Sequence, residues 1–297
     1  MRSALSRMSV LIVLSTAIMS AQDLAERDTQ LAAAAPNHDL TSNGGEGWVR
    51  AWRRAAAKAR ASQPHFVAPL VTTHVMLVQQ FRYDTFWQRD SSGGGMTSNY
   101  GSSRGLEIIP SSRLEVGLFP PAYVVHQTGV ASGFGDLSYQ VKFRAFSATE
   151  GKGDYFVGFF LGGSVPTGSA LIGLGHPVLS PTFAVAKGLG PWDIQSTFGA
   201  TLPTSSTGVL GRTLLFNTEV DYRIKGKLWP MLEQNSTFWI DGPLSGNKQV
   251  FLTPGVVVGP FSLNAKLHFA FGFGAQTAVS SFHQYSHRWI LSIRFPF

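Results

Sequence analysis

Hydrophobic and polar positions alternate with a period of two along most of the chain after residue 66. The clearest case is residues 287–297, where every second side chain is large and apolar: Trp289, Leu291, Ile293, Phe295 and Phe297. Arginine or serine stands at most of the positions between them. This period predicts a β-strand with one apolar face and one polar face.

The alternation continues through about twelve predicted strands, of which the first is expected at residues 71–87. Residues 100–124 are divided by a turn at 110–112, and counting two strands there gives the even number that single-chain bacterial barrels have. Short connections alternate with longer ones along the chain. That pattern is typical of periplasmic turns and extracellular loops.

Apolar rows such as Leu267, Phe269, Phe271 and Phe273 need an apolar environment, and the chain offers no helices to cover them. Apolar residues make up 44% of the chain and charged residues only 14%, below the usual quarter. No run of roughly 20 apolar residues is present, which excludes a helical membrane bundle. The sequence therefore predicts an all-β fold, a transmembrane antiparallel β-barrel. A closed soluble barrel or sandwich is the alternative, and it explains the apolar rows less well.

The N-terminal part has a different character. Residues 1–21 are expected to be a signal peptide, with Arg2 and Arg7 before a short apolar stretch. Residues 22–65 are expected to be a periplasmic linker containing a short basic amphipathic helix at 48–62, and residues 66–297 the outer-membrane barrel. The helix could lie on an anionic leaflet, sit in the barrel mouth or be a solvated linker.

Composition narrows the chemistry further. The chain has no cysteine, which excludes disulfides, thiolate metal sites and cysteine nucleophiles. The net charge of +7 is mild and dispersed, so no nucleic-acid partner is expected. His74 and His268 do not make a metal motif, and no phosphate loop or dinucleotide fingerprint occurs. We expect no metal and no cofactor.

If the apolar face meets lipid, the polar face lines a lumen. Twelve strands lie between the filled eight-stranded barrel and the open sixteen-stranded porin, so a narrow pore is expected, constricted by loops or by the N-terminal helix. The predicted lumen carries both signs of charge, so weak ion selectivity is expected. Its candidate lining residues are Arg82, Asp84, Arg113, Glu115, Lys142, Arg144, Asp193, Glu219, Asp221, Arg223, Glu233, Lys266 and His268.

Several stretches together resemble a known family: residues 132–144, 164–169, 175–204, 228–239, 249–259 and the ending WILSIRFPF. They are similar to the outer-membrane transporter-like barrels labelled as belonging to the meta-pathway of phenol degradation. The resemblance covers roughly residues 66–297. It implies passage of small, aromatic or apolar molecules, and it assigns no functional residues.

The sequence thus predicts an outer-membrane channel of a Gram-negative-type bacterium that passes small solutes by passive diffusion. Its expected partners are outer-membrane lipid, the solute, and the barrel assembly machinery through the final strand ending in Phe297. Two alternatives stay open: a structural or adhesive barrel without transport, and a membrane-embedded hydrolase. A hydrolase would need a serine, a histidine and an acid or asparagine held together near one rim, and no local motif supplies them.

Overall fold

The computed structural model describes residues 44–90, 95–101, 104–127 and 131–297. The chain divides into two units, Met1–Trp48 and Val49–Phe297. The second unit contains every strand and most of the N-terminal helix, and it is the unit considered below. The predicted signal peptide lies outside the described residues.

Helix α2 spans Gly44–Ala61 and is rich in alanine and arginine. Lys58 and Arg60 lie in its last turn, where positive charge is favourable beside the helix carbonyl ends. Ala56 and Ala59 are buried, whereas the arginines of the helix are exposed. The helix therefore contacts the rest of the unit through its small side chains and keeps its basic side in solvent.

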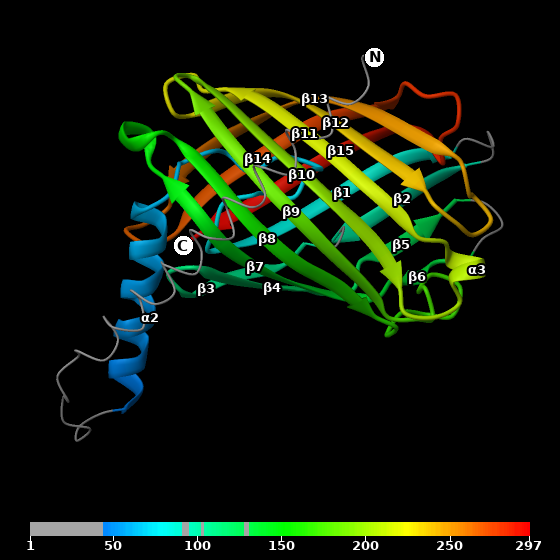
Figure 1. Ribbon diagram of the computed structural model, residues 1–297, viewed down its shortest axis with the longest axis horizontal. Helices are drawn as coiled ribbons and strands as arrows, with labels where there is room; N and C mark the ends of the chain where they lie inside the picture. The colour runs from blue at the N-terminus through cyan, green and yellow to red at the C-terminus, as the bar shows by residue number, and fades with distance from the viewer. Residues whose placement is uncertain (1–43, 91–94, 102–103, 128–130) are drawn as a thin grey trace, which may run out of the picture. The chain divides into compact units, whose positions relative to one another are not determined.

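Fifteen strands form one antiparallel sheet that closes on itself, because the first strand pairs with the last (Figure 1). The strands are β1 (Gln80–Asp90), β2 (Met96–Gly101), β3 (Leu106–Ser111), β4 (Leu114–Phe119), β5 (Tyr123–His126), β6 (Gly133–Phe134), β7 (Leu137–Ala148), β8 (Tyr155–Val165), β9 (Val178–Leu189), β10 (Trp192–Pro203), β11 (Thr213–Tyr222), β12 (Leu228–Trp239), β13 (Lys248–Ser262), β14 (His268–Ala278) and β15 (Tyr285–Pro296). Short helices η1 (Glu150–Lys152) and α3 (Thr207–Leu210) lie in two connections.

These fifteen strands make a barrel of twelve, as predicted, because three of the barrel strands are each interrupted and so count as two strands. β1 pairs with β2 along one part of its length and with β3 along another, so β2 and β3 are two parts of one barrel strand. In the same way β4 continues as β5, and β6 as β7. Pro120 and Pro121 stand between β4 and β5, and their missing N–H groups explain that break.

The two ends of the barrel differ. Connections β3–β4, β7–β8, β9–β10, β11–β12 and β13–β14 close one end, here called the turn end, where β15 also finishes. The longer connections lie at the opposite loop end. The first strand begins at Gln80, so the prediction of a strand from residue 71 was wrong. Residues 62–79 precede that strand, and most of them are buried.

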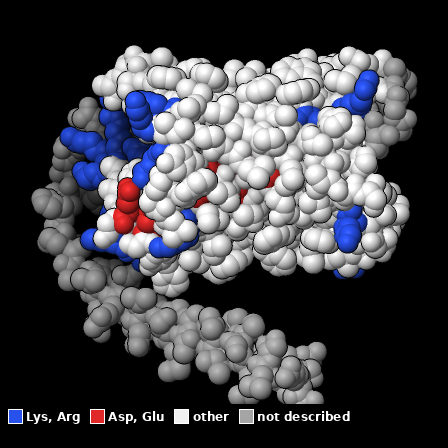
Figure 2. Space-filling model, turned by 90° about the horizontal axis from the view of Figure 1, so that it is seen from above, with Lys and Arg blue, Asp and Glu red and all other residues white. Residues whose placement is uncertain are grey.

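The outer face of the barrel is apolar. Across the closing pair of strands, Phe81 lies opposite Phe295 and Tyr83 opposite Ile293, and Phe81 and Tyr83 are exposed. Figure 2 shows Lys and Arg gathered at the ends, with a largely uncharged surface between them. A water-soluble protein rarely exposes so large an apolar surface. The closed ladder and this belt are the features of a barrel embedded in a lipid bilayer.

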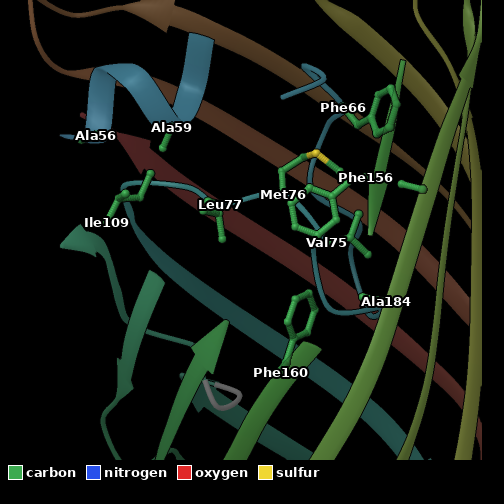
Figure 3. Packing of buried hydrophobic residues seen from close by; sticks show 11 residues of the cluster. Ala56, Ala59, Phe66, Val75, Met76, Leu77, Ile109, Phe156, Phe160 and Ala184 are labelled. Atoms are coloured by element: carbon green, nitrogen blue, oxygen red, sulfur yellow. The ribbon is translucent and has the colours of Figure 1, made fainter. Parts of the chain in front are cut away.

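Among the described residues, no helix is both long and apolar enough to cross a membrane. Buried apolar residues gather inside the barrel near its turn end (Figure 3). This cluster joins Ala56 and Ala59 of α2 to Val75, Met76 and Leu77, and its remaining members are Phe66, Ile109, Phe156, Phe160, Ala184 and Ala186.

Candidate functional site

The lumen contains a chain segment that belongs to no strand. Residues 62–79, here called the inner loop, connect helix α2 to β1 without regular secondary structure. The Gln63 side chain donates to the carbonyl of Leu77 at 2.7 Å and accepts from its N–H at 3.2 Å. The two arms of the inner loop are therefore joined to each other, and its tip lies at residues 68–72.

One carboxylate of the wall holds the backbone of the tip. The two oxygens of Glu233 on β12 accept from the N–H groups of Leu70 at 2.5 Å, Val71 at 3.0 and 3.1 Å, and Thr72 at 2.6 Å. Three successive N–H groups around one anion form a backbone anion site. Hydrogen bonds to a charged acceptor are about twice as strong as neutral ones.

Arginines of the wall hold the carbonyl groups of the same tip. Arg82 donates to Leu70 at 2.8 Å, and Arg104 donates to Val71 at 3.0 Å. Arg294 donates to the carbonyls of residues 68 and 69 at 2.5 and 2.9 Å. The polar backbone of the tip is thus bonded to side chains of the barrel, and no β-ladder bond holds it.

The tip also fits an apolar depression in the wall. Leu70 lies over Gly255 of β13 and over Gly272 and Gly274 of β14. A Cβ atom at Gly274 would come within 2.5 Å of a Leu70 methyl carbon, so only glycine leaves the required space. Leu70 is buried in a second cluster with Trp229, Met231, Val257 and Ile290.

The predicted lumen residues fall into groups. Arg82 pairs with Asp84 at 2.6 Å, and both side chains are almost fully buried. Lys142 pairs with Glu115 at 2.8 Å, and Glu115 also accepts from the N–H of Val78 in the inner loop at 2.5 Å. Glu233 belongs to the tip contacts described above. Much of the polar face of the lumen is therefore bonded either within ion pairs or to the inner loop.

Other predicted lumen residues lie near the turn end. Arg144 donates to the Ala59 carbonyl at the end of α2 at 2.8 Å. Arg223 bonds Glu150 at 2.9 Å, at the surface. Arg113 and Lys266 are exposed, and His268 is half-buried.

Asp193, Glu219 and Asp221 are buried close together on β10 and β11. Gln195 donates to Glu219 at 3.1 Å, while one oxygen of Asp193 and both oxygens of Asp221 accept no hydrogen bond within the described residues. In the part of the chain that the structure describes, no group of three or more His, Asp or Glu residues could hold a metal ion.

Sequence reasoning missed the inner loop. Val75 and Leu77 alternate with polar neighbours in the manner of a strand, which explains the prediction of a strand at 71–87. The length of that predicted strand, residues 71–87, argues against it, because a membrane-crossing strand needs only about 9–11 residues. Arg104 and Gln195, which bind the inner loop, were also missed.

Two cavities lie on either side of the tip. The turn-end cavity has a volume of about 930 Å³, and its lining includes Phe66, His74 and Leu77 of the inner loop. The loop-end cavity has a volume of about 550 Å³, and Leu70 and Val71 form part of its wall. The inner loop therefore separates the lumen into two chambers.

A serine–histidine contact occurs at the loop end. His176 lies 2.8 Å from the Ser205 hydroxyl and 2.9 Å from the Ser206 hydroxyl; the histidine is half-buried and both serines are exposed. A nucleophile and base of this kind need a third group that orients the histidine. Both ring nitrogens already contact serine hydroxyls, and within the described residues no acid or amide side chain bonds His176.

Comparison with known proteins fits this geometry. A family model with the description "Putative MetA-pathway of phenol degradation" matches residues 59–291. The chain belongs to this family. The match begins at the end of α2 and includes the whole inner loop, so the loop is part of the family's region and not an addition to it.

The chain is also similar to solved structures of outer-membrane proteins. An outer-membrane channel from Pseudomonas putida F1 is 14% identical, with a TM-score of 0.52, covering 77% of this chain and 98% of that one. The β domain of a Bordetella autotransporter is also 14% identical, with a TM-score of 0.43, and the match covers 74% of this chain and 100% of that one. The first likeness shows an outer-membrane barrel fold. The comparison with curated proteins gave no match.

Proposed function

We propose that the protein is a channel that passes small molecules, aromatic or apolar compounds among them, by passive diffusion through the outer membrane. The observation that carries this proposal is a closed barrel whose lumen contains two cavities with, among the described residues, the inner loop between them. The structure is the closed state of the channel. The family description and the channel of Pseudomonas putida F1 support the same function.

The inner loop can leave its position without damage to the barrel. β1 pairs with β15 from Gln80 to Asp90, and of the inner loop only its last residue, Gln79, adds a backbone bond to this pair, from the N–H of Phe297. The tip is held by side chains such as Glu233 and Arg82, and such bonds can be exchanged for water one at a time. Opening therefore replaces contacts inside the lumen and leaves the strand pairing unchanged.

Selectivity follows from the residues that line the freed path. Arg82–Asp84 and Lys142–Glu115 are pairs of opposite sign, so neither sign dominates the middle of the lumen. A pore with paired charges discriminates by width and by hydrogen bonding more than by ion type. Weak ion selectivity is the consequence.

The same proposal gives a role to the outer surface and to the last strand. The exposed aromatic and aliphatic rows contact outer-membrane lipid, and β15, with its alternating apolar face, is the segment that the assembly machinery recognises. Transport, not catalysis, is the proposed activity, because the His176–serine contact has no orienting acid within the described residues.

Single-channel recording in planar bilayers tests the proposal. The wild-type protein should give discrete current steps separated by long closed periods. Replacing residues 66–76 by a Gly-Ser segment of equal length, which keeps Gln63 and Leu77, should give a channel that stays open. A barrel that is correctly folded yet carries no current in either form would contradict a transport function.

A further inference from the structure

The turn-end cavity has a chemistry that the middle of the lumen lacks. Its floor and walls are apolar and aromatic, with Trp52, Phe66 and Trp229 among the lining residues. Five cationic side chains also line it, and none of its lining side chains is Asp or Glu. The loop-end cavity, by contrast, is lined by both Asp84 and Asp136 beside its arginines.

Three of the five cations are already engaged. Arg294 bonds the inner loop, Arg223 bonds Glu150, and Arg60 donates to the backbone oxygen of Phe297 at 2.8 Å. The side chains of Arg53 and Lys266 have no ion pair or hydrogen bond within the described residues, and both are exposed at the edge of the cavity. Positive charge is therefore available there for a ligand.

The wall also contains polar atoms that lack a partner. Nδ1 of His74, Oε1 of Gln79 and Nε1 of Trp229 are buried and make no hydrogen bond within the described part of the chain. All three residues line this cavity. Nε2 of His74 donates to the Phe66 carbonyl, so Nδ1 of the uncharged ring is an acceptor, as is Oε1 of Gln79. Of the three atoms, Nε1 of Trp229 is the donor that can bind an anionic ligand, and buried polar atoms are normally bonded.

We infer that the turn-end cavity is a binding site for an amphipathic organic anion, of the class of aromatic carboxylates. The aromatic body lies against Phe66 and Trp229, and the carboxylate lies toward Arg53 and Lys266 at the edge. A volume of about 930 Å³ lies within the roughly 300–1,000 Å³ range of small-molecule sites. This inference rests on the proposed channel function and names a class of its solutes.

The inference also gives helix α2 a role. Trp52 and Arg53 lie on α2 before the family match at 59–291, so this wall of the cavity is a feature outside the matched region. The buried Ala56 and Ala59 bring the helix close to the inner loop, which positions Arg53 at the cavity edge. The helix then completes a site and is more than a linker.

Isothermal titration with the full-length protein in phosphatidylcholine nanodiscs tests the inference. The probes are 2-naphthoate, its neutral isostere 2-naphthamide, and the cation 2-naphthyltrimethylammonium. We expect 2-naphthoate to bind at least tenfold more tightly than either of the others. Equal binding of the carboxylate and the amide, or binding of none of the probes, would overturn the inference.

Substitutions locate the site. Arg53→Gln and Lys266→Gln should each weaken 2-naphthoate binding by roughly three- to tenfold, as expected for a partly solvated charge. Arg54→Gln is the matched control on the same helix, because Arg54 does not line the cavity, and it should leave binding unchanged. Trp229→Phe keeps an aromatic ring and removes Nε1–H, and should also weaken binding. Equal effects of Arg53→Gln and Arg54→Gln would show surface attraction only and overturn the assignment.

Current recordings separate this inference from the channel proposal. 2-Naphthoate added at the turn-end side should lower the fraction of time in the conducting state, because the cavity that it fills is walled in part by the inner loop in its closed position. The effect from the other side should be much smaller, because the closed inner loop lies between the loop end and the cavity. Current steps without 2-naphthoate binding would overturn the anion site alone. Binding without any current would uphold the site and contradict the channel.

Discussion

Replacing Glu233 by glutamine should shift the inner loop toward its open position. Glu233 accepts from three successive backbone N–H groups of the tip, at distances between 2.5 and 3.1 Å. The amide keeps one acceptor oxygen but loses the charge and the second oxygen. Hydrogen bonds to charged groups contribute about 1.5–3 kcal/mol each.

The expected loss is about 1.5–3 kcal/mol of closed-state stability, since the amide recovers part of the bonding. This corresponds to a rise of roughly 10- to 150-fold in the open-to-closed ratio. Single-channel recording measures that ratio directly as the fraction of time in the conducting state. The folded fraction is checked in parallel by the difference in gel migration before and after boiling.

Asp193→Asn is the matched control. Asp193 is also a buried carboxylate of the lumen wall, but it makes no bond to the inner loop within the described residues. Its open fraction should stay at the wild-type value. If Glu233→Gln and Asp193→Asn change the open fraction equally, or if neither does, the carboxylate does not hold the gate and this reasoning is wrong.

Three further predictions concern stability and the loops. Lys142→Met leaves Glu115 and Glu107 buried without their cation, which should cost about 3–5 kcal/mol of stability and lower the unfolding temperature. The double variant Lys142→Met/Glu115→Leu should lose less stability than Lys142→Met. An equal loss in the two variants would contradict the pairing. Phe159→Arg, on the lipid face, should cost about 2–4 kcal/mol in denaturant unfolding from lipid, whereas Leu189→Arg near the turn end should cost about 0–1 kcal/mol. At the loop end, hydrogen bonds from the Arg212 side chain and then its N–H hold the pKa of Asp241 below its usual range. A lowered pKa stabilises the contact above the ordinary carboxyl pKa, and this is lost as pH falls through the folded value. Asp241→Asn should therefore speed thermolysin cleavage at residues 203–213 and 239–248 at pH 7. Pepsin at pH 2 should cut the wild type and the variant at equal rates. A difference in cleavage rate that persists at pH 2 would argue against this ion pair.

The barrel itself could be predicted because its outer face repeats one simple rule. Apolar side chains at every second position must meet lipid, and the ladder must close because no unpaired edge is tolerated in hydrocarbon. The register of Phe81 opposite Phe295 and Tyr83 opposite Ile293 is the result of that rule. The strand count followed from the turn at 110–112.

The inner loop could not be predicted in this way, because its residues obey a different constraint. Val75 and Leu77 are apolar since they pack inside the barrel, and the local sequence does not distinguish an inner apolar contact from a lipid contact. Glu233 is a predicted lumen charge and Arg294 is a polar position of the last predicted strand, but only the fold shows that they bind the backbone of residues some 160 to 230 positions away. Long-range contacts of this kind leave no periodic pattern in a single sequence.

The three glycines beneath Leu70 illustrate the same limit. Gly255, Gly272 and Gly274 look like ordinary strand glycines in the sequence. In the structure they form the depression that receives the tip. Glycine in a strand often marks the close approach of another backbone or side chain. The sequence contains this signal, but it does not show which residue approaches the glycines.

A reversible tether between the inner loop and the wall tests the central claim most directly. The chain has no cysteine, so Leu70→Cys with Gly274→Cys would introduce the only thiol pair, at a point where the two residues are in contact. We predict that oxidation abolishes the current steps, that reduction restores them, and that either single cysteine variant conducts in both conditions. Undiminished conductance through a fully oxidised pair would show that solute passes without movement of the inner loop, and would contradict this account.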